Sequence, residues 1–355
     1  MMDKLKTAFL GKNKNRSICI AAVIVAYVVI EILMYTGSLK SLFINLLVPV
    51  TSYIIVALAL NLVVGISGEL SLGHAGFMSI GAFTGVIVSS VTASMIPNDI
   101  VRLFVAIIIG AIVAAIFGFL ISIPVLKLQG DYLAIVTLAF GQIIKSLINN
   151  TYLGFDASGF HFSFITNTVT LAKGGKMLIN GPIGATATNR ISTFTVSVIL
   201  LIITLIIIFN FINSKYGRSV MATRDDRIAA QSVGIDIVKT KTIAFVLSAG
   251  IAGAAGVLYG LNFSTLVPAK FDFNQSILIL VYVVLGGLGN MLGTIISTAV
   301  LVLLPELLRF LADYRMLIYA IVLIVIMIVT NNPTINEKMK QMFKKKKAEG
   351  DLNNG

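Results

Sequence analysis

The chain has 355 residues, of which 57% are hydrophobic and 12% are charged, and its mean hydropathy is +0.97. Soluble globular domains carry about 25% charged residues, and a soluble fold of this length still exposes a large area to water. The composition therefore excludes a disordered chain, a collagen-like chain and a disulfide scaffold, the last because Cys19 is the single cysteine. It also disfavours a soluble enzyme, and a lipid bilayer is the solvent that fits this chain.

The chain opens with a basic stretch, residues 1–16, which is followed by the apolar run Ile18–Tyr35. This order resembles a signal peptide, but the apolar run is too long and no small-residue cleavage site follows it. We therefore expect a retained first membrane helix behind a basic cytoplasmic N-terminus.

Apolar runs that approach the roughly 20 residues needed to cross a bilayer recur along the chain. After the first run they are Phe43–Val64, Ala75–Met95, Leu103–Ile123, Tyr132–Ile148, Phe194–Phe211, Ile243–Leu261 and Met316–Val329. A longer stretch, residues 276–304, is interrupted by a run that contains Gly286, Gly287 and Gly289. We split it at these glycines, and the first piece, Ser276–Leu285, is short enough to be a half-helix of the kind found in transporters.

Basic residues at both ends of the chain decide the number of crossings. The positive-inside rule places both ends in the cytoplasm, which requires an even number. Ten spans put the polar segment 149–191 outside and the charged segment 213–240 inside, with 18 of the 27 Lys and Arg residues on the inner side. We predict an all-α, polytopic transmembrane helical bundle of about ten spans. It forms one membrane domain over residues 17–331 and ends in a disordered basic tail, residues 332–355.

The sequence contains no phosphate-binding loop of the Walker type. It contains no zinc-site spacing either, since His74, His161 and Cys19 are scattered. Acidic residues are nearly absent from the apolar runs, where Glu31 is the one candidate. Ion-coupled carriers usually need carboxylates at depth. We therefore expect no cofactor or metal in this chain, and an energy source on another polypeptide.

The charged segment 213–240 has the features of a short helix. Ser219 suits an N-cap and Gly234 suits a C′ position, which predicts one helix of about fourteen residues between them. Asp236 could cap the next membrane helix. Spacing alone leaves two interpretations open, a solvated amphipathic hairpin and a helix that docks into a groove of a partner. Four small apolar residues would share one face at helical spacing: Ala222, Ala229, Ala230 and Val233.

Several long motifs resemble the permeases of ABC importers for branched-chain amino acids. The pattern over Gly217–Ile235 resembles the coupling loop of that family. The other similar motifs occur in the family's order and are Ser67–Ala82, Leu128–Gly141, Gly250–Gly260 and Leu285–Asn290. The second of these four, together with the long outer loop, is more similar to M-type (LivM-like) permeases than to H-type ones.

This resemblance implies a machine in the bacterial plasma membrane. It would consist of two permease chains, the second a homologous H-type chain, two subunits that bind ATP and magnesium, and an external solute-binding protein. The outer loop departs from the family pattern, because residues 154–159 read Gly-Phe-Asp-Ala-Ser-Gly where a Gly-Gly pair is typical. The coupling loop would dock in a cleft of one ATP-binding subunit through Gly217, Arg218, Ala222, Arg224, Asp225, Asp226, Ala229, Ala230 and Gly234.

Glycines have two interpretations in this chain. Within helices they favour close helix packing, which we expect for Gly76, Gly81, Gly85, Gly253, Gly256 and Gly260. Between spans, at residues 65–73 and 286–293, they favour unwound backbone along a polar pathway. The candidate pathway residues are Gly68, Ser71, Gly73, His74, Thr137, Gly286, Gly287 and Gly289.

His74 fits a core histidine with satisfied hydrogen bonds as well as it fits a pathway residue. The two glycine-rich junctions also predict a pseudo-repeat, in which spans 2–3 correspond to spans 8–9 and both junctions lie on the same side of the membrane.

The sequence therefore predicts a passive translocation subunit, not an enzyme, that carries leucine, isoleucine or valine along an apolar path. Three alternatives remain at this point. One is the same machine for urea or another small polar solute. Another is a stand-alone secondary carrier or channel, which the missing deep carboxylates disfavour. The last is a membrane enzyme of lipid metabolism, for which the chain lacks a cluster of catalytic His, Asp or Glu.

Overall fold

A computed structural model gives the structure of the chain for residues 2–37, 41–127, 130–156, 159–166, 169, 171, 175–186, 188–308 and 314–331. The predicted basic tail, residues 332–355, lies outside this described part. The chain divides into two compact units, Met1–Ala299 and Val300–Gly355. The helix that contains the boundary between them belongs to both units.

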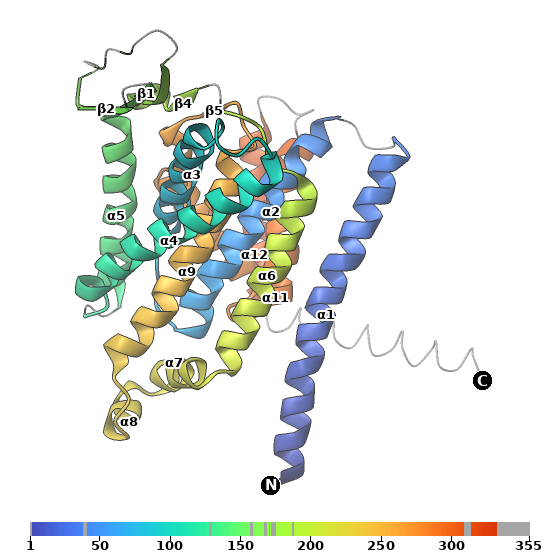
Figure 1. Cartoon of the computed structure of the whole chain (residues 1–355). Helices are drawn as coiled ribbons and strands as arrows, with labels where there is room; N and C mark the ends of the chain where they lie inside the picture. The colour runs from blue at the N-terminus through green and yellow to red at the C-terminus, as the bar shows by residue number, and fades with distance from the viewer. Residues whose placement is uncertain are drawn as a thin grey trace. The chain divides into compact units, whose positions relative to one another are not determined.

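Helices follow one another along the chain in the order that the apolar runs predict (Figure 1). The first unit holds α1 (Met2–Tyr35), α2 (Ser41–Asn61), α3 (His74–Val91), α4 (Asp99–Val125), α5 (Asp131–Asn149), α6 (Phe194–Asn213), α7 (Lys215–Asp225), α8 (Arg227–Ser232), α9 (Ile237–Gly260) and α10 (Phe273–Gly286). Helix α11 (Met291–Leu307) crosses the boundary, and α12 (Arg315–Asn331) lies in the second unit.

Seven helices in the described part are long and apolar enough to cross a membrane: α1, α2 with the turn that follows it, α3, α4, α5, α6 and α9. Helices α10 and α11 are apolar but shorter. The predicted break in residues 276–304 is confirmed, because α10 ends at Gly286 and α11 begins at Met291. Gly287 and Gly289 have φ angles of +91° and +79°, which glycine adopts without strain.

Helices α3, α4 and α9 form the closely packed centre of the first unit, and glycines make this possible. A Cβ atom on Gly81 would collide with the backbone of Gly253, and one on Gly256 would collide with the carbonyl of Met78. Small residues therefore bring these helix backbones into direct contact, as is usual in membrane bundles. The other glycines for which we expect a packing role also lie at close contacts: Gly76 with Gly141, Gly85 with Val257, Gly253 with Ala114 and Gly260 with Ala82.

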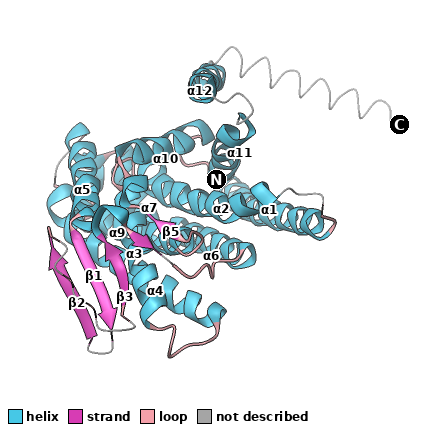
Figure 2. Cartoon of the chain, turned by 90° about the horizontal axis from the view of Figure 1, so that it is seen from above, coloured by secondary structure: helices cyan, strands magenta, loops and turns pink. Residues whose placement is uncertain are grey.

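The prediction of an all-α chain is wrong for the polar segment between α5 and α6. This segment forms β1 (Thr151–Asp156), β2 (Gly159–Phe164) and β3 (Lys176–Asn180), which pair antiparallel in the order β2-β1-β3 (Figure 2). A short turn η2 (Gly181–Ile183) and β4 (Ala185–Thr186) follow, and β4 pairs with β5 (Thr265–Leu266) ahead of the turn η3 (Pro268–Phe271). The physical cause is the alternation of aromatic and polar residues in β2, a period-2 pattern typical of a strand.

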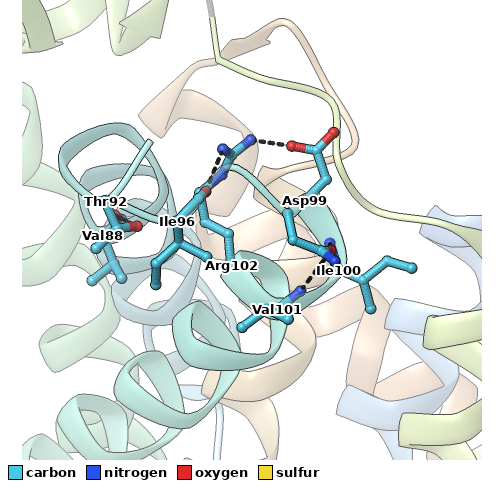
Figure 3. Close-up of polar contacts among 8 residues, drawn as sticks. Val88, Thr92, Ile96, Asp99, Ile100, Val101 and Arg102 are labelled. Atoms are coloured by element: carbon cyan, nitrogen blue, oxygen red, sulfur yellow. Dashed lines mark hydrogen bonds and ion pairs between the residues drawn. The ribbon is translucent and has the colours of Figure 1, made fainter. Parts of the chain in front are cut away.

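Helix α3 ends at Val91, earlier than the predicted Met95, because the chain turns sharply into α4 (Figure 3). The side chain of Asn98 caps α4 by accepting from the backbone N–H groups of Ile100 and Val101. Arg102 is 5% exposed, and it ties the turn together by donating to the Ile96 carbonyl at 3.3 Å and to Asp99 at 2.5 Å. This turn therefore needs a buried cation on the first turn of α4.

Helix α1 begins at Met2, so the basic stretch that we expect to be cytoplasmic continues directly into the first apolar run. Its contacts with the bundle run along α6, where Arg16 donates to Asn210 at 3.0 Å and the ring of Tyr27 lies 5.7 Å from that of Phe194. Glu31 accepts a hydrogen bond from Thr195 at 3.4 Å.

The glycine contact between α3 and α9 can be tested with one added methyl group. Gly81→Ala should lower the stability of the folded chain by about 1–3 kcal/mol, because the new Cβ atom overpacks a backbone–backbone contact. The measurement is the midpoint of thermal unfolding in detergent. Gly141→Ala is the matched control, because its Cβ atom would meet its nearest neighbours at an ordinary 3.9 Å, and an unchanged or higher midpoint is expected. Equal midpoints for the two variants would contradict the packing role.

Candidate functional site

The two polar parts of the first unit lie at opposite ends of the helices (Figure 1). Helices α7 and α8 lie at one end, together with the N-terminal end of α1, and the small sheets lie at the other. At the sheet end, Lys270 of η3 lies 4.1 Å from the ring centroid of Phe263, and burial lowers the pKa of its ammonium group. The candidate site lies where α7 and α8 meet the membrane helices.

The charged segment forms two helices, so the prediction of one helix from Ser219 to Gly234 is wrong. Helix α7 starts earlier, because the hydroxyl of Ser214 accepts from the N–H of Gly217. It ends at Asp225, since Asp226 has an extended backbone and caps α8 by accepting from the N–H groups of Ile228 and Ala229 at 2.9 Å. The predicted caps at the far end are confirmed. Gly234 has a φ angle of +83°, and Asp236 accepts from the N–H of Lys239 at 3.0 Å.

The break at Asp226 also removes the predicted shared face of small residues. Ala230 is buried, whereas Ala229 and Val233 are exposed, Val233 at 75%. The most exposed apolar side chain of α8 is that of Ile228, at 82%. A partner that meets α8 therefore contacts Ile228 and Val233 first.

The chain between α2 and α3 unwinds in two stages. Helix α2 runs into a π-helical turn, η1 (Leu62–Ile66), and an irregular segment, residues 67–73, then leads to α3. We call residues 67–73 the α2–α3 linker. π-Helical turns are rare and occur frequently at functional sites. Because the linker is not helical, its backbone N–H and C=O groups need hydrogen-bond partners elsewhere in the protein.

Arg224 of α7 reaches the π-helical turn that precedes this linker. Its Nη1 atom donates to the carbonyl of Gly65 at 2.8 Å, and its Nη2 atom pairs with Asp225 at 3.0 Å. Gly68 has a φ angle of +73°, and a Cβ atom on it would lie 2.6 Å from the Arg224 side chain. The charged helix is therefore joined directly to the unwound backbone of the membrane helices.

An ion pair joins the middle of the linker to α9. Glu69 and Lys241 are in direct contact, and their side chains are only 15% and 7% exposed. Neither charge is well hydrated, so each depends on the other. Since Lys241 lies in the second turn of α9, the pair also joins the linker to the helix that follows α8.

The end of the linker packs against α5. The N–H of Leu72 donates to the hydroxyl of Thr137 at 3.0 Å, and a Cβ atom on Gly73 would lie 2.7 Å from the Thr137 carbonyl. Thr137 and Gly73 therefore lie together, as two members of the predicted pathway set.

His74 is the first residue of α3 and is 2% exposed. Its Nε2 atom lies 2.8 Å from the hydroxyl of Ser248 and its Nδ1 atom lies 3.3 Å from that of Ser71. Ser248 in turn donates to the carbonyl of Ala59. The described contacts of His74 are those of a core histidine with both ring nitrogens satisfied.

Asn61, at the end of α2, connects the linker region to the α10–α11 turn. It is fully buried, and its side-chain oxygen accepts from the N–H of Gly289 at 2.8 Å. Its nitrogen donates to the Thr294 hydroxyl at 2.8 Å and to the Asn290 carbonyl at 3.4 Å. A Cβ atom on Gly65 would collide with Gly289. The two glycine-rich junctions thus lie together, as the predicted pseudo-repeat requires, although the repeat itself stays a prediction.

A cavity of about 530 Å³ lies beside this meeting point. Gly289 is the member of the predicted pathway set that lines it, whereas Gly286 packs against Thr294 of α11. The remaining lining residues come from α1, the π-helical turn, α6, α7, the α10–α11 turn and α11: Ile18, Cys19, Ile66, Phe209, Ile212, Asn213, Met221, Asn290, Met291 and Leu292. Among the described residues, no three His, Cys, Asp or Glu side chains gather as a metal site.

Sequence reasoning missed four residues that hold this site together. Asn61 and Ser248 are polar residues within apolar runs, which was the available signal, since a buried polar side chain needs a partner. Glu69 lies inside the motif Ser67–Ala82, from which we named other residues as candidates. Lys241 precedes an apolar run and looked like a loop cation. The partners themselves lie far away in sequence, 172 residues apart for Glu69 and Lys241.

A known protein family matches most of the chain. The family described as "Branched-chain amino acid transport system / permease component" matches residues 42–329. The chain is 34% identical over 224 residues to the high-affinity branched-chain amino acid transport system permease proteins LivM of Salmonella typhimurium and of Escherichia coli, a match that covers 59% of this chain and 52% of each relative. It is 25% identical over 177 residues to the fructose import permease protein FruG of Bifidobacterium longum, which covers 48% of both chains.

The chain therefore spans about half the length of the curated relatives it matches. No solved structure matches it.

The ion pair between the linker and α9 predicts a specific pattern of stabilities. Lys241→Met should lower the stability of the chain by about 3–5 kcal/mol, because it leaves the carboxylate of Glu69 buried without a partner. The double variant Glu69→Gln with Lys241→Met should recover most of this loss, since no buried charge remains. Thermal unfolding of the three proteins in the same detergent measures the effect. A double variant that is less stable than Lys241→Met would show that the pair is not the cause.

Proposed function

Because the chain belongs to the family of permease components of branched-chain amino acid transport systems, we propose that it is the translocation subunit of an ABC importer for leucine, isoleucine or valine. The observation that carries the proposal is the match to this family over residues 42–329, together with the identity to two LivM permeases. With seven helices of spanning length in the described part, the chain is a multi-pass membrane protein. As a permease, it is a transport subunit of the plasma membrane.

The orientation that we propose follows the charges. Ten crossings would place α7, α8 and both termini in the cytoplasm and the small sheets outside. Two facts support this arrangement. The N-terminal end of α1 lies at the same end of the helices as α7 and α8, and the sheets lie at the opposite end (Figure 1). The short α10 and the returning α11 would then form a hairpin that enters from outside.

We assign the chemistry of ATP to partner chains. Two ATP-binding subunits would hold ATP and magnesium. The exposed Ile228 of α8, and Val233 directly after it, would enter a cleft on one of these subunits. A second, H-type permease chain would complete the membrane part, and an external binding protein would deliver the solute at the sheet end. No cofactor is assigned to this chain.

The contacts of Arg224 suggest how movement would pass from α7 into the membrane. A shift of α7 would pull on the Gly65 carbonyl through Arg224. Gly65 packs on Gly289, and Asn61 binds the same turn, so the pull would reach the α10–α11 hairpin. The Glu69–Lys241 pair would carry the displacement of α9 into the linker at the same time. The cavity beside this turn would open or close accordingly.

A second candidate solute deserves a test because FruG of Bifidobacterium longum, described as a fructose import permease, is also similar to this chain. The same machine would then carry a sugar, urea or another small polar solute. An apolar path lined by a few backbone dipoles does not discriminate strongly between neutral polar solutes, so specificity would rest on the binding protein.

Uptake by reconstituted vesicles tests the proposed function. The chain is assembled with its second permease and ATP-binding subunits in liposomes, and the external binding protein is added. Radiolabelled leucine, isoleucine or valine should accumulate only when ATP and the binding protein are both present. Accumulation of fructose or urea in place of leucine would overturn the proposed solute, and uptake without ATP would overturn the proposed class.

The role of Arg224 in coupling predicts a loss that spares assembly. Arg224→Glu should lower solute-stimulated ATP hydrolysis by about tenfold or more, within the range of typical coupling energies, because it removes the hydrogen bond to Gly65. Lys239→Glu is the matched control, since it makes the same charge change on an exposed side chain at the start of α9. The control should keep its stimulation. Normal stimulation of Arg224→Glu in an intact complex would refute the coupling role.

A further inference from the structure

The outer strand of the larger sheet carries an aromatic row that the transport function does not use. Phe160, Phe162 and Phe164 alternate along β2 and are 58%, 66% and 48% exposed. We call these three residues the aromatic edge. So much exposed aromatic surface on one strand is unusual for a water-facing sheet and marks an interaction site.

The sheet register shows which face the aromatic edge occupies. Phe164, Phe162 and Phe160 pair with Thr151, Leu153 and Phe155 of β1, and directly paired residues point to the same face. On the opposite face, a Cβ atom on Gly154 would lie against Val169 and Leu171. Val169 and Leu171 therefore cover that opposite face at Gly154.

The face that bears the aromatic edge includes a contact with a membrane helix. Thr151, which pairs with Phe164 on this face, donates to the carbonyl of Leu147 at the end of α5. Strand β3 contacts α3. Strand β2 is the edge of the sheet farthest from β3, so its phenylalanines continue the same face beyond the part that packs on the bundle (Figure 2).

The sheet lies at the level where a membrane helix ends. Helix α5 ends at Asn149 and β1 begins at Thr151, whose hydroxyl donates to the carbonyl of Leu147 at 2.8 Å. The strands run across the end of the helices, as the two views show (Figures 1 and 2). Leu147 and Ile143 of α5 are 49% and 61% exposed, so the lipid-facing side of α5 continues up to the sheet.

From these observations we propose that the aromatic edge rests in the lipid headgroup region and anchors the sheet to the membrane surface. The face is joined to the end of α5 through Thr151, and the exposed apolar side of α5 continues up to it. The chain has no tryptophan, the residue that most often serves as an interfacial anchor. Phenylalanine side chains also bury well at the boundary between headgroups and acyl chains.

This anchor would hold the sheet at a fixed height while the helices below it rearrange. The connection to α5 is short and is braced a second time, because the side chain of Asn150 donates to the carbonyl of Ser146 at 2.8 Å. The lipid surface therefore fixes one edge of the sheet, and α5 fixes the adjoining end.

The absence of tryptophan makes a direct test possible. Phe162→Trp gives a full-length chain with one indole, which is reconstituted in nanodiscs that contain brominated phosphatidylcholine. Bromine near the headgroup should quench its fluorescence more strongly than bromine near the chain terminus. Ser163→Trp is the matched control, because it places the indole on the opposite face of the same strand, and little quenching is expected.

Phe160→Trp serves as a second reporter, so that a folding defect in one variant does not leave the proposal undecided. An unchanged thermal unfolding midpoint identifies a folded variant. Quenching of the folded edge variants above the Ser163→Trp control supports lipid contact. Quenching equal to the control overturns it. Protection from the brominated lipid on addition of an external binding protein also overturns it, since the face would then be a protein-docking surface.

Discussion

The unwound backbone between α2 and α3 is the constraint on which the rest of this structure depends. Within a bilayer an unpaired N–H or C=O group costs several kcal/mol, so a non-helical segment persists only if protein groups satisfy it. Here Arg224 takes the Gly65 carbonyl, and Thr137 takes the Leu72 amide. Asn61 does the same for the amide of Gly289 in the α10–α11 turn. Each partner comes from a different helix, so these backbone groups are satisfied only where the helices pack together.

This dependence gives the linker a mechanical consequence. Hydrogen bonds and ion pairs join particular atoms, so they fix where one segment is held to another. The hydrogen bond of Arg224 and the Glu69–Lys241 pair fix α7 and α9 to the same short segment, from two sides. Under the proposed function, the linker is therefore where a displacement of α7 or α9 would reach α2 and α3.

Hydropathy and glycine spacing predicted the helices and the break at Gly286–Asn290, because both depend on local sequence. They failed where the structure depends on distant partners. Arg224 looks like a solvated charge in its segment, yet its carbonyl partner lies 159 residues away. The strands were missed because a six-residue alternation such as that of β2 is short beside the long apolar runs around it. Ser219 does not have its predicted capping role, because α7 begins at Lys215 and the hydroxyl of Ser214, directly after α6, accepts from the N–H of Gly217.

The break at Asp226 shows how one loop can face two partners. In a continuous helix through residues 215–233, the charged and apolar side chains would share one axis. Any rotation of that helix would then move all of them together. Two short helices joined by an extended residue separate the inward contact of α7 from the exposed surface of α8. Arg224, at the end of α7, is directed to the linker, while Ile228, in the first turn of α8, is left exposed. Asp226 makes this possible by satisfying the first amides of α8, so the division between inward and outward contacts rests on a single capping carboxylate.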